Sequence, residues 1–207
     1  MVRSISLLLL AYLIGSFPGS VLVARWAGSD LRALGDGNPG AHNVMRHVGR
    51  GWGVLALLID AGKGALAVIS AQQWSDLLWL PIVAAWLAVA GHNYSIWLRG
   101  RGGKGLATGL GVVLALFPDL IWLTIGGAIV LIGLTRNLAF SGVAVALLLS
   151  FAAWWRSDPL ILVLAPLGVL LLMAIRQWPD LQRMWRAAPD KRDLILNRWI
   201  RDREAKL

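Results

Sequence analysis

Residues 138–155 read LAFSGVAVALLLSFAAWW, and residues 159–176 read PLILVLAPLGVLLLMAIR. The first stretch has no charged residue, and the second has only Arg176 at its end. A helix needs about 20 predominantly apolar residues to cross a bilayer, so each stretch has nearly the length and composition of a transmembrane helix. These two stretches indicate the class of protein, which is an integral membrane protein.

The rest of the chain repeats this pattern. Hydrophobic residues make up 57% of the sequence and charged residues 15%, whereas a soluble domain has about a quarter charged residues. Five more apolar stretches are predicted to be spans, at 4–26, 52–72, 77–98, 105–118 and 120–135. We therefore predict an all-α bundle of seven transmembrane helices. Six spans are the alternative, because only Phe117-Pro118-Asp119 separates two of the stretches.

The basic residues predict the orientation of this bundle. With the N-terminus outside, the inner loops contain Arg32, Arg46, Arg50, Arg99, Arg101, Lys104 and Arg136, and the tail from Arg176 onward is also inside. The outer loops keep Arg3 and Arg156, accompanied by three aspartates. Because cytoplasmic loops carry an excess of Lys and Arg, the C-terminus is expected to be cytoplasmic. The net charge of +9 is thus a topology signal, and no nucleic-acid partner is expected.

One polar segment between the first two predicted spans is unusual. It reads Gly35-Asp36-Gly37-Asn38-Pro39-Gly40-Ala41-His42-Asn43-Val44-Met45-Arg46. Its glycines permit positive φ angles and allow backbone N–H groups to converge on an anion. Side-chain donors would come from Asn38, Asn43 and Arg46. The alternative is a plain tight loop with solvated polar residues.

A second polar segment, Arg99-Gly100-Arg101-Gly102-Gly103-Lys104-Gly105, directly precedes a predicted span. The N-terminus of a helix presents free N–H groups and a partial positive charge, so this turn is a candidate phosphate site. It is not a nucleotide P-loop, because Lys104 is not followed by Ser or Thr. The alternative is that the turn only marks the inner side of the membrane.

Two pairs of polar residues lie inside predicted spans. Asp60 and Lys63 are three residues apart and share a helix face, so we expect them to pair and to support the site. His92 and Asn93 are near the inner end of the third span. We expect them within reach of the glycine-rich turn, although a lone buried histidine is more often a packing residue.

These segments together resemble the acyl-phosphate:glycerol-3-phosphate acyltransferases of the PlsY type. The motifs are Gly15-Ser16-Phe17-Pro18, the loop from Gly35 to Arg46, Asp60-Ala61-Gly62-Lys63-Gly64, and Gly91-His92-Asn93 through Gly103-Lys104-Gly105-Leu106-Ala107-Thr108. They occur in the family's order and at its spacing, over about residues 10–137. No histidine is followed five residues later by aspartate, the signature of the other major glycerophosphate acyltransferases.

The resemblance implies a seven-helix enzyme of the bacterial inner membrane whose active site faces the cytoplasm. It implies acyl phosphate and glycerol 3-phosphate as substrates, lysophosphatidate as product, membrane lipid as surroundings, and no cofactor or metal. Catalytic roles are then expected for Asp36, His92, Lys104 and Asp180. The residues expected to bind substrate are Gly35, Gly37, Asn38, Gly40, Asn43, Arg46, Lys63, Asn93, Arg101, Gly102, Gly103, Thr108 and Gln177.

The chain departs from the family pattern at a few polar positions. Asp36 replaces a serine, His42 replaces a threonine, and Gln177 and Asp180 replace a histidine and an asparagine. A carboxylate in an anion-binding loop repels phosphate unless a cation offsets it, so we expect Arg46, Arg101 or Lys104 to pair with Asp36. Alternatively, Asp36 accepts the proton of the acceptor hydroxyl, with Asp180 as the rival base.

Two other functions remain open from the sequence. One is a divergent relative that acts on another anionic acceptor. The other is a non-catalytic binder or transporter of phosphorylated metabolites, which would need a polar path through both leaflets. The outer half of the predicted spans offers few polar residues, which disfavours transport.

The predicted domain organisation is a membrane domain at residues 1–176 and a basic cytoplasmic tail at 177–207. Apolar residues of the tail fall on one face of a helix: Leu194, Ile195, Leu196, Trp199 and Ile200. We therefore expect an interfacial helix on acidic lipid headgroups.

The orientation can be tested with single cysteines, because the chain has none of its own. Cysteines at Ser75 and Ser157 should react with an impermeant thiol reagent added to intact cells, whereas one at Asp190 should react only after lysis. Labelling of Asp190 in intact cells would reverse the orientation.

Overall fold

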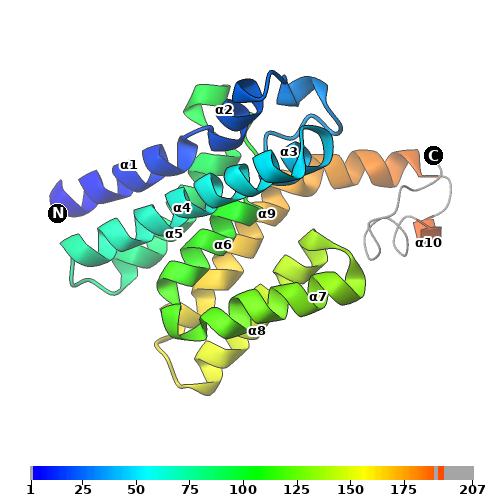
Figure 1. The fold of residues 1–207 in the computed structure, drawn as a ribbon. Helices are drawn as coiled ribbons and strands as arrows, with labels where there is room; N and C mark the ends of the chain where they lie inside the picture. The colour runs from blue at the N-terminus through cyan, green and yellow to red at the C-terminus, as the bar shows by residue number, and fades with distance from the viewer. Residues whose placement is uncertain (1, 189–190, 194–207) are drawn as a thin grey trace. The chain divides into compact units, whose positions relative to one another are not determined.

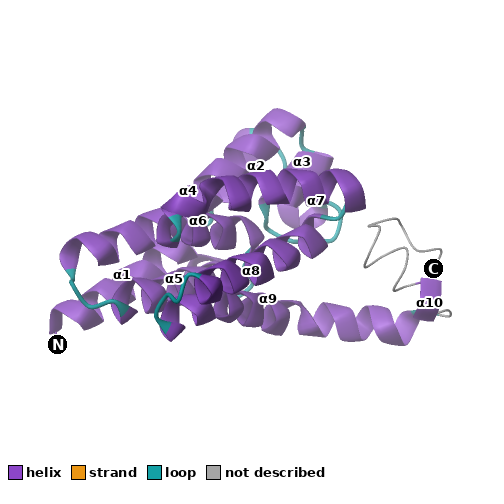
Figure 2. Cartoon of the chain, turned by 90° about the horizontal axis from the view of Figure 1, so that it is seen from below, coloured by secondary structure: helices purple, strands orange, loops and turns teal. Residues whose placement is uncertain are grey.

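The computed structural model describes residues 2–188 and 191–193. Every regular element within these residues is helical, and Figure 2 shows helices and loops but no strand there. The chain divides into two units, Met1–Pro118 and Asp119–Leu207, which are described separately. The tail residues 194–207, for which we predicted an interfacial helix, lie outside the described part.

The first unit contains six α-helices and two short 3-10 turns (Figure 1). In chain order these are α1 (Val2–Ser16), α2 (Gly19–Trp26), η1 (Leu31–Ala33), α3 (Ala41–His47), α4 (Arg50–Trp74), α5 (Trp79–Asn93), η2 (Ile96–Leu98) and α6 (Leu106–Leu116). The second unit follows the turn η3 (Pro118–Leu120). It contains the π-helical turn η4 (Trp122–Gly126), α7 (Gly127–Thr135), α8 (Leu138–Trp155), α9 (Leu160–Ala187) and the short α10 (Lys191–Asp193).

The membrane class and the all-helical fold are confirmed. In the described part, four helical stretches are long and apolar enough to cross a bilayer, namely Val2–Trp26, Arg50–Trp74, Leu138–Trp155 and Leu160–Ala187. Leu106–Leu116 and Trp122–Thr135 are shorter apolar helices. Each predicted span is helical in the structure, some as one helix and some as two consecutive helical segments, but the count of seven crossings stays a prediction.

The first predicted span differs from the observed structure, because it is not one continuous helix. α1 ends at Ser16, and α2 begins at Gly19. Pro18 causes the break, since its nitrogen has no hydrogen to donate and its ring crowds the preceding turn. Residues 4–26 are therefore two helices joined at Phe17-Pro18.

Side chains from other helices satisfy the carbonyls that this break releases. The ammonium of Lys63 donates to the Phe17 carbonyl at 2.6 Å, and the Ser95 hydroxyl donates to the Ser16 carbonyl at 2.5 Å. These side-chain hydrogen bonds replace the lost backbone ones, which is required in a membrane because an unsatisfied backbone group in hydrocarbon costs several kcal/mol. The break is thus fixed by α4 and by the residues that follow α5.

Glycines allow the helices of this unit to approach closely. α1 crosses α5 where Gly15 faces Ala88 and Gly91 faces Tyr12. A Cβ atom on either glycine would overlap the carbonyl oxygen of its partner residue. This arrangement is typical of membrane helix packing, in which small residues bring the backbones together.

The contact between α4 and α6 uses the same device. Gly64 lies against the backbone of Thr108, and Gly111 lies against the backbone of Ala61. A Cβ atom on either glycine would overlap a carbonyl oxygen of the opposite helix. The α4 helix is therefore held firmly beside α6, which begins at the glycine-rich turn.

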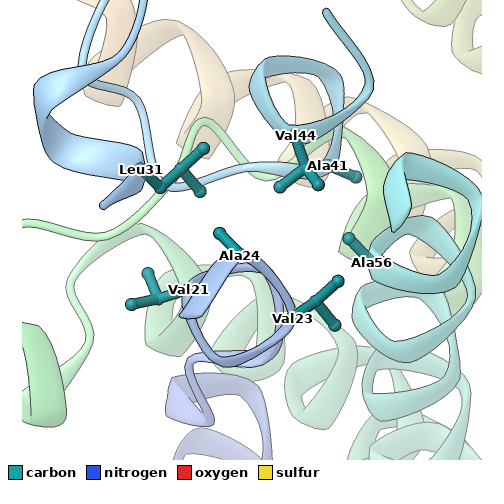
Figure 3. Close-up of a cluster of buried hydrophobic side chains, with 7 residues drawn as sticks. All are labelled: Val21, Val23, Ala24, Leu31, Ala41, Val44 and Ala56. Atoms are coloured by element: carbon teal, nitrogen blue, oxygen red, sulfur yellow. The ribbon is translucent and has the colours of Figure 1, made fainter. Parts of the chain in front are cut away.

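A small apolar cluster anchors the loop between α2 and α3 (Figure 3). All of its members are buried, and they come from α2, η1, α3 and α4: Val21, Val23, Ala24, Leu31, Ala41, Val44 and Ala56. Because both ends of residues 32–40 are attached to this cluster, the loop is fixed at the end of the membrane helices.

In the second unit, α8 packs against α7 and α9. Asn137 caps α8, with its side-chain oxygen accepting the Phe140 N–H at 2.8 Å. Arg156 pairs with Asp119 and Asp158, which ties the loops at one end of this unit together. α9 continues to Ala187, beyond the predicted end of the last span at 176.

The glycine packing predicts a stability difference between two alanine variants. Gly91→Ala should destabilise the protein by about 1–3 kcal/mol, because the methyl group meets the backbone of α1. Gly62→Ala is the matched control, since a Cβ there meets no atom within 4 Å. Thermal unfolding in detergent measures both. Equal unfolding temperatures for the two variants would contradict the close α1–α5 contact.

Candidate active site

The loop before α3 owes its shape to glycines and an aspartate. Gly35 and Gly37 have φ angles of +56° and +67°, which strongly favour glycine. Between them, the Asp36 carboxylate accepts the N–H of Asn38 at 3.1 Å. This local bond is an Asx turn, which fixes the direction of the Asp36 side chain.

The side-chain amide of Asn43 holds the loop in place. This buried nitrogen lies 3.2 Å from the Leu31 carbonyl, 2.9 Å from that of Leu34 and 3.1 Å from that of Asn38. We predicted that the Asn43 side chain donates a hydrogen bond to the substrate. In the structure its donors are used by the loop itself, so Asn43 shapes the site.

We predicted that one of Arg46, Arg101 and Lys104 pairs with Asp36, and in the structure Lys104 does so. The Lys104 ammonium donates to the Asp36 carboxylate at 2.9 Å, with side chains that are 31% and 50% exposed respectively. Partial burial alone would raise the pKa of Asp36. The hydrogen bond and charge of Lys104, together with the Asn38 N–H, outweigh burial and hold the pKa below its ordinary value. Asp36 is therefore ionised at neutral pH.

The glycine-rich turn is clamped onto the end of α5. The Gly102 N–H donates to the Asn93 carbonyl and the Gly103 N–H to the His92 carbonyl, each at 3.1 Å. A Cβ on Gly102 would overlap the backbone of α5, and one on Gly103 would overlap the His92 ring. We expected these amides to face an anion, and the structure gives them a different use. The backbone amides in the first turn of α6 have no partner within the helix.

A buried polar cluster lies behind this turn. The Lys63 ammonium is 2.9 Å from the Asp60 carboxylate, which confirms the predicted pair. The Ser20 hydroxyl donates to the other carboxylate oxygen at 2.5 Å, and His92 Nδ1 is 3.8 Å from the first. Asp60 is 1% exposed and Lys63 7%. These three polar neighbours offset part of the hydration that the buried carboxylate loses.

The loop, the turn and the buried cluster meet at one small pocket. Its lining residues come from the helix break, α4, α5 and both polar segments: Ser16, Phe17, Pro18, Gly19, Pro39, Asp60, Lys63, His92, Ser95, Leu98 and Gly103. The segments that sequence analysis singled out separately thus form one site in the first unit.

Other predicted residues lie outside this cluster. Arg46 and Arg101 have exposed side chains, on α3 and in the glycine-rich turn respectively. Thr108 is buried in the α4–α6 contact. Gly40 precedes α3 and donates its N–H to the Asn38 carbonyl at 2.9 Å. Substrate binding by these residues stays a prediction.

Gln177 and Asp180 belong to the second unit, on α9. The Gln177 amide donates to the Met173 carbonyl at 3.3 Å. The Asp180 carboxylate accepts a hydrogen bond from Arg183 at 2.6 Å, one helical turn further along. Their predicted roles in substrate binding and proton transfer remain predictions.

Two serines that were not predicted as site residues, Ser20 and Ser95, also contact the site. Ser20 binds the buried carboxylate, and Ser95 binds a carbonyl at the helix break. A proline within an apolar stretch signals released carbonyls, so nearby polar side chains could have been assigned to them. Which serine would do so depends on the tertiary fold.

These features define a class, which is a multi-pass helical membrane protein with a buried Asp–Lys pair and a glycine-rich turn at one small pocket. The sequence matches the glycerol-3-phosphate acyltransferase family over residues 5–187, and the chain belongs to this family.

Individual relatives and solved structures agree with this assignment. The chain is 44% identical to a glycerol-3-phosphate acyltransferase of Thermus thermophilus over 73% of its own length and 78% of the relative's. It is 41% identical to that of Synechococcus sp. JA-3-3Ab, with 80% and 83% covered. The crystal structure of PlsY (YgiH), an integral membrane glycerol 3-phosphate acyltransferase in its glycerol 3-phosphate form, matches with a TM-score of 0.76 and 27% identity, covering 88% of this chain and 92% of that one.

The Asp36–Lys104 pair predicts a measurable titration. The ionised carboxylate is favoured by folding, so its stabilising effect is present above the ordinary carboxyl pKa and is lost as the pH falls through the lowered value. In Lys104→Met, burial should raise the Asp36 pKa above that in the unmodified protein. Side-chain carbon NMR of labelled aspartate, assigned with Asp36→Asn, measures this change. An unchanged pKa would exclude the pair in solution.

Proposed function

We propose that this chain transfers a fatty acyl group from acyl phosphate to the 1-hydroxyl of glycerol 3-phosphate. The products are lysophosphatidate and inorganic phosphate. The family match over residues 5–187 carries this proposal. It is supported by similarity to PlsY structures in a glycerol 3-phosphate form and a lysophosphatidic acid form, which correspond to the acceptor and the product.

The membrane arrangement is part of the proposal. Seven spans, with the N-terminus outside, bring both polar segments to the cytoplasmic side of a bacterial inner membrane. The excess of basic residues in the predicted inner loops supports this orientation. Glycerol 3-phosphate would then arrive from the cytoplasm, and the acyl chain of the donor would remain in the lipid.

Lys104 is proposed to bind substrate phosphate. Its ammonium donates a hydrogen bond to the Asp36 carboxylate at 2.9 Å. Because both side chains are partly exposed, another anion can replace the carboxylate at Lys104. Phosphate offers more negative charge than a carboxylate, and the first-turn amides of α6 add donors and a favourable helix end. We therefore expect phosphate to replace Asp36 on Lys104.

The transfer itself requires one bond to form and one to break. The acceptor hydroxyl oxygen attacks the acyl carbonyl carbon, the bond from that carbon to the phosphate oxygen breaks, and phosphate leaves with the bonding electrons. Asp36, released from Lys104, is proposed to accept the hydroxyl proton, and Asp180 is the rival candidate for this base. His92, whose ring lies against Gly103, is proposed to hydrogen-bond the reacting groups.

The remaining predicted residues are proposed either to bind the substrates or to shape the site. Lys63 places positive charge at the pocket, and Arg46, Arg101 and Gln177 are proposed to contact the substrates directly. Asn38, Asn43 and the glycines at 35, 37, 40, 102 and 103 shape the two segments. Asn93 holds the glycine-rich turn through its carbonyl. Thr108 is proposed to bind substrate at the start of α6.

One observation favours a second candidate, a relative that has diverged to another anionic acceptor. Asp36 introduces a carboxylate where the family resemblance leads us to expect serine, and this carboxylate occupies Lys104. If the natural acceptor carries less negative charge than glycerol 3-phosphate, the Asp36 carboxylate would repel that acceptor less and would interfere less with its binding. An acceptor screen with acyl phosphate as donor separates the two candidates.

The proposal predicts the donor and the effect of removing Lys104. Purified protein should form lysophosphatidate from acyl phosphate and glycerol 3-phosphate but not from acyl-coenzyme A. Lys104→Ala should lower kcat/KM for glycerol 3-phosphate about 100-fold, or about 2.7 kcal/mol, because a charge-assisted contact is lost. The control Arg198→Ala removes a basic residue of the tail and should have little effect. Comparable rates with both donors, or equal small effects of both variants, would contradict the proposal.

The departures from the family predict the outcome of a triple variant. If they reduce acylation of glycerol 3-phosphate, Asp36→Ser combined with Gln177→His and Asp180→Asn should raise kcat/KM for this acceptor several-fold. Lysophosphatidate formation by the triple variant and the unmodified protein is compared under the same conditions. Efficient activity of the unmodified protein, with no gain in the triple variant, would exclude divergence.

A further inference from the structure

Asp60 has no role in the proposed transfer, yet it has three polar neighbours at the pocket. It lies in α4 and is 1% exposed. Its neighbours come from three helices, namely Ser20 of α2, Lys63 of α4 and His92 of α5. A carboxylate with this position links the helix break to the histidine beside the glycine-rich turn.

We infer that Asp60 is a positioning residue, which fixes the His92 ring so that its Nε2 atom faces the glycine-rich turn. The inference deepens the proposed function and rests on it. Its basis is that the two ring nitrogens face different elements. Nδ1 is 3.8 Å from an Asp60 oxygen, whereas Nε2 is the atom that a Cβ on Gly103 would meet first.

The carboxylate can serve several partners at once, because each oxygen accepts more than one hydrogen. One oxygen accepts the Ser20 hydroxyl at 2.5 Å, which locks the carboxylate plane. The other oxygen faces both Lys63, at 2.9 Å, and His92. The Lys63 ammonium also donates to the Phe17 carbonyl, so it is held toward the helix break. Asp60 therefore does more than neutralise Lys63, since its second oxygen also faces the imidazole.

The distance between Asp60 and His92 fits a positioning role. At 3.8 Å it is an ion-pair distance, longer than a hydrogen bond, and catalytic contacts often tighten only when substrate binds. A carboxylate at Nδ1 favours the proton on that nitrogen and leaves Nε2 to interact with substrate. Both residues and Gly103 line the same pocket, so this orientation turns Nε2 toward the glycine-rich turn at that pocket.

A double-mutant cycle on the acyl-transfer rate tests the inference. Asp60→Asn keeps the shape of the side chain and removes its charge, and His92→Gln keeps a polar group near the Nε2 position. We expect Asp60→Asn to lower kcat about tenfold and His92→Gln about 100-fold, with less than about a twofold change in KM for glycerol 3-phosphate. Because Asp60 acts through His92, the double variant should be no slower than His92→Gln alone.

Val68→Ala is the matched control for loosened packing. Val68 is fully buried on α4, eight residues beyond Asp60, so its truncation should lower the unfolding temperature and leave kcat within about twofold. If Asp60→Asn does not fold because Lys63 is left unpaired, the same cycle is measured with Asp60→Glu, which keeps a carboxylate for Lys63 and shifts it relative to the His92 ring.

The outcomes are distinct. Losses that multiply in the double variant, or a loss of kcat in Val68→Ala equal to that in Asp60→Asn, would overturn the positioning role. No lysophosphatidate from the unmodified protein would instead refute the proposed function.

Discussion

A lysine buried among membrane helices must be neutralised, and in this protein its neutralisation determines where the polar site can form. Lys63 pairs with Asp60 one turn earlier on α4, and its ammonium also reaches the Phe17 carbonyl released by Pro18. Truncating one partner of such a pair would leave an uncompensated buried charge, at a cost of about 3–5 kcal/mol. The ion pair and the broken helix therefore depend on each other: the break supplies an acceptor, and the lysine compensates the break.

The position of the site follows from this arrangement. α2 begins after the break and packs with η1, α3 and α4 around the cluster of Figure 3, which holds the loop containing Asp36. On the other side, the carbonyls at the end of α5 accept the amides of Gly102 and Gly103 and so hold the turn that precedes Lys104. The contact of Lys104 with Asp36 joins the two segments across 68 positions of sequence.

Much of this could be predicted from the sequence, because spacing and charge are local signals. The apolar stretches predicted the helices, the i,i+3 spacing predicted the Asp60–Lys63 pair, and charge compensation predicted a cation on Asp36. The functions of Asn43, Gly102 and Gly103 could not be predicted, because whether an amide binds an anion or a carbonyl depends on which backbone lies opposite. Ser20 and Ser95 were missed for the same reason, since their partners lie 40 and 79 positions away.

The central claim is that Lys104 exchanges the Asp36 carboxylate for substrate phosphate. The most direct measurement is a crystal structure of this protein with glycerol 3-phosphate, grown from a lipid mesophase. The account predicts phosphate within hydrogen-bond distance of the Lys104 ammonium and the first amides of α6, with Asp36 separated from Lys104. Phosphate bound elsewhere, with the 2.9 Å contact between Lys104 and Asp36 intact, would contradict it.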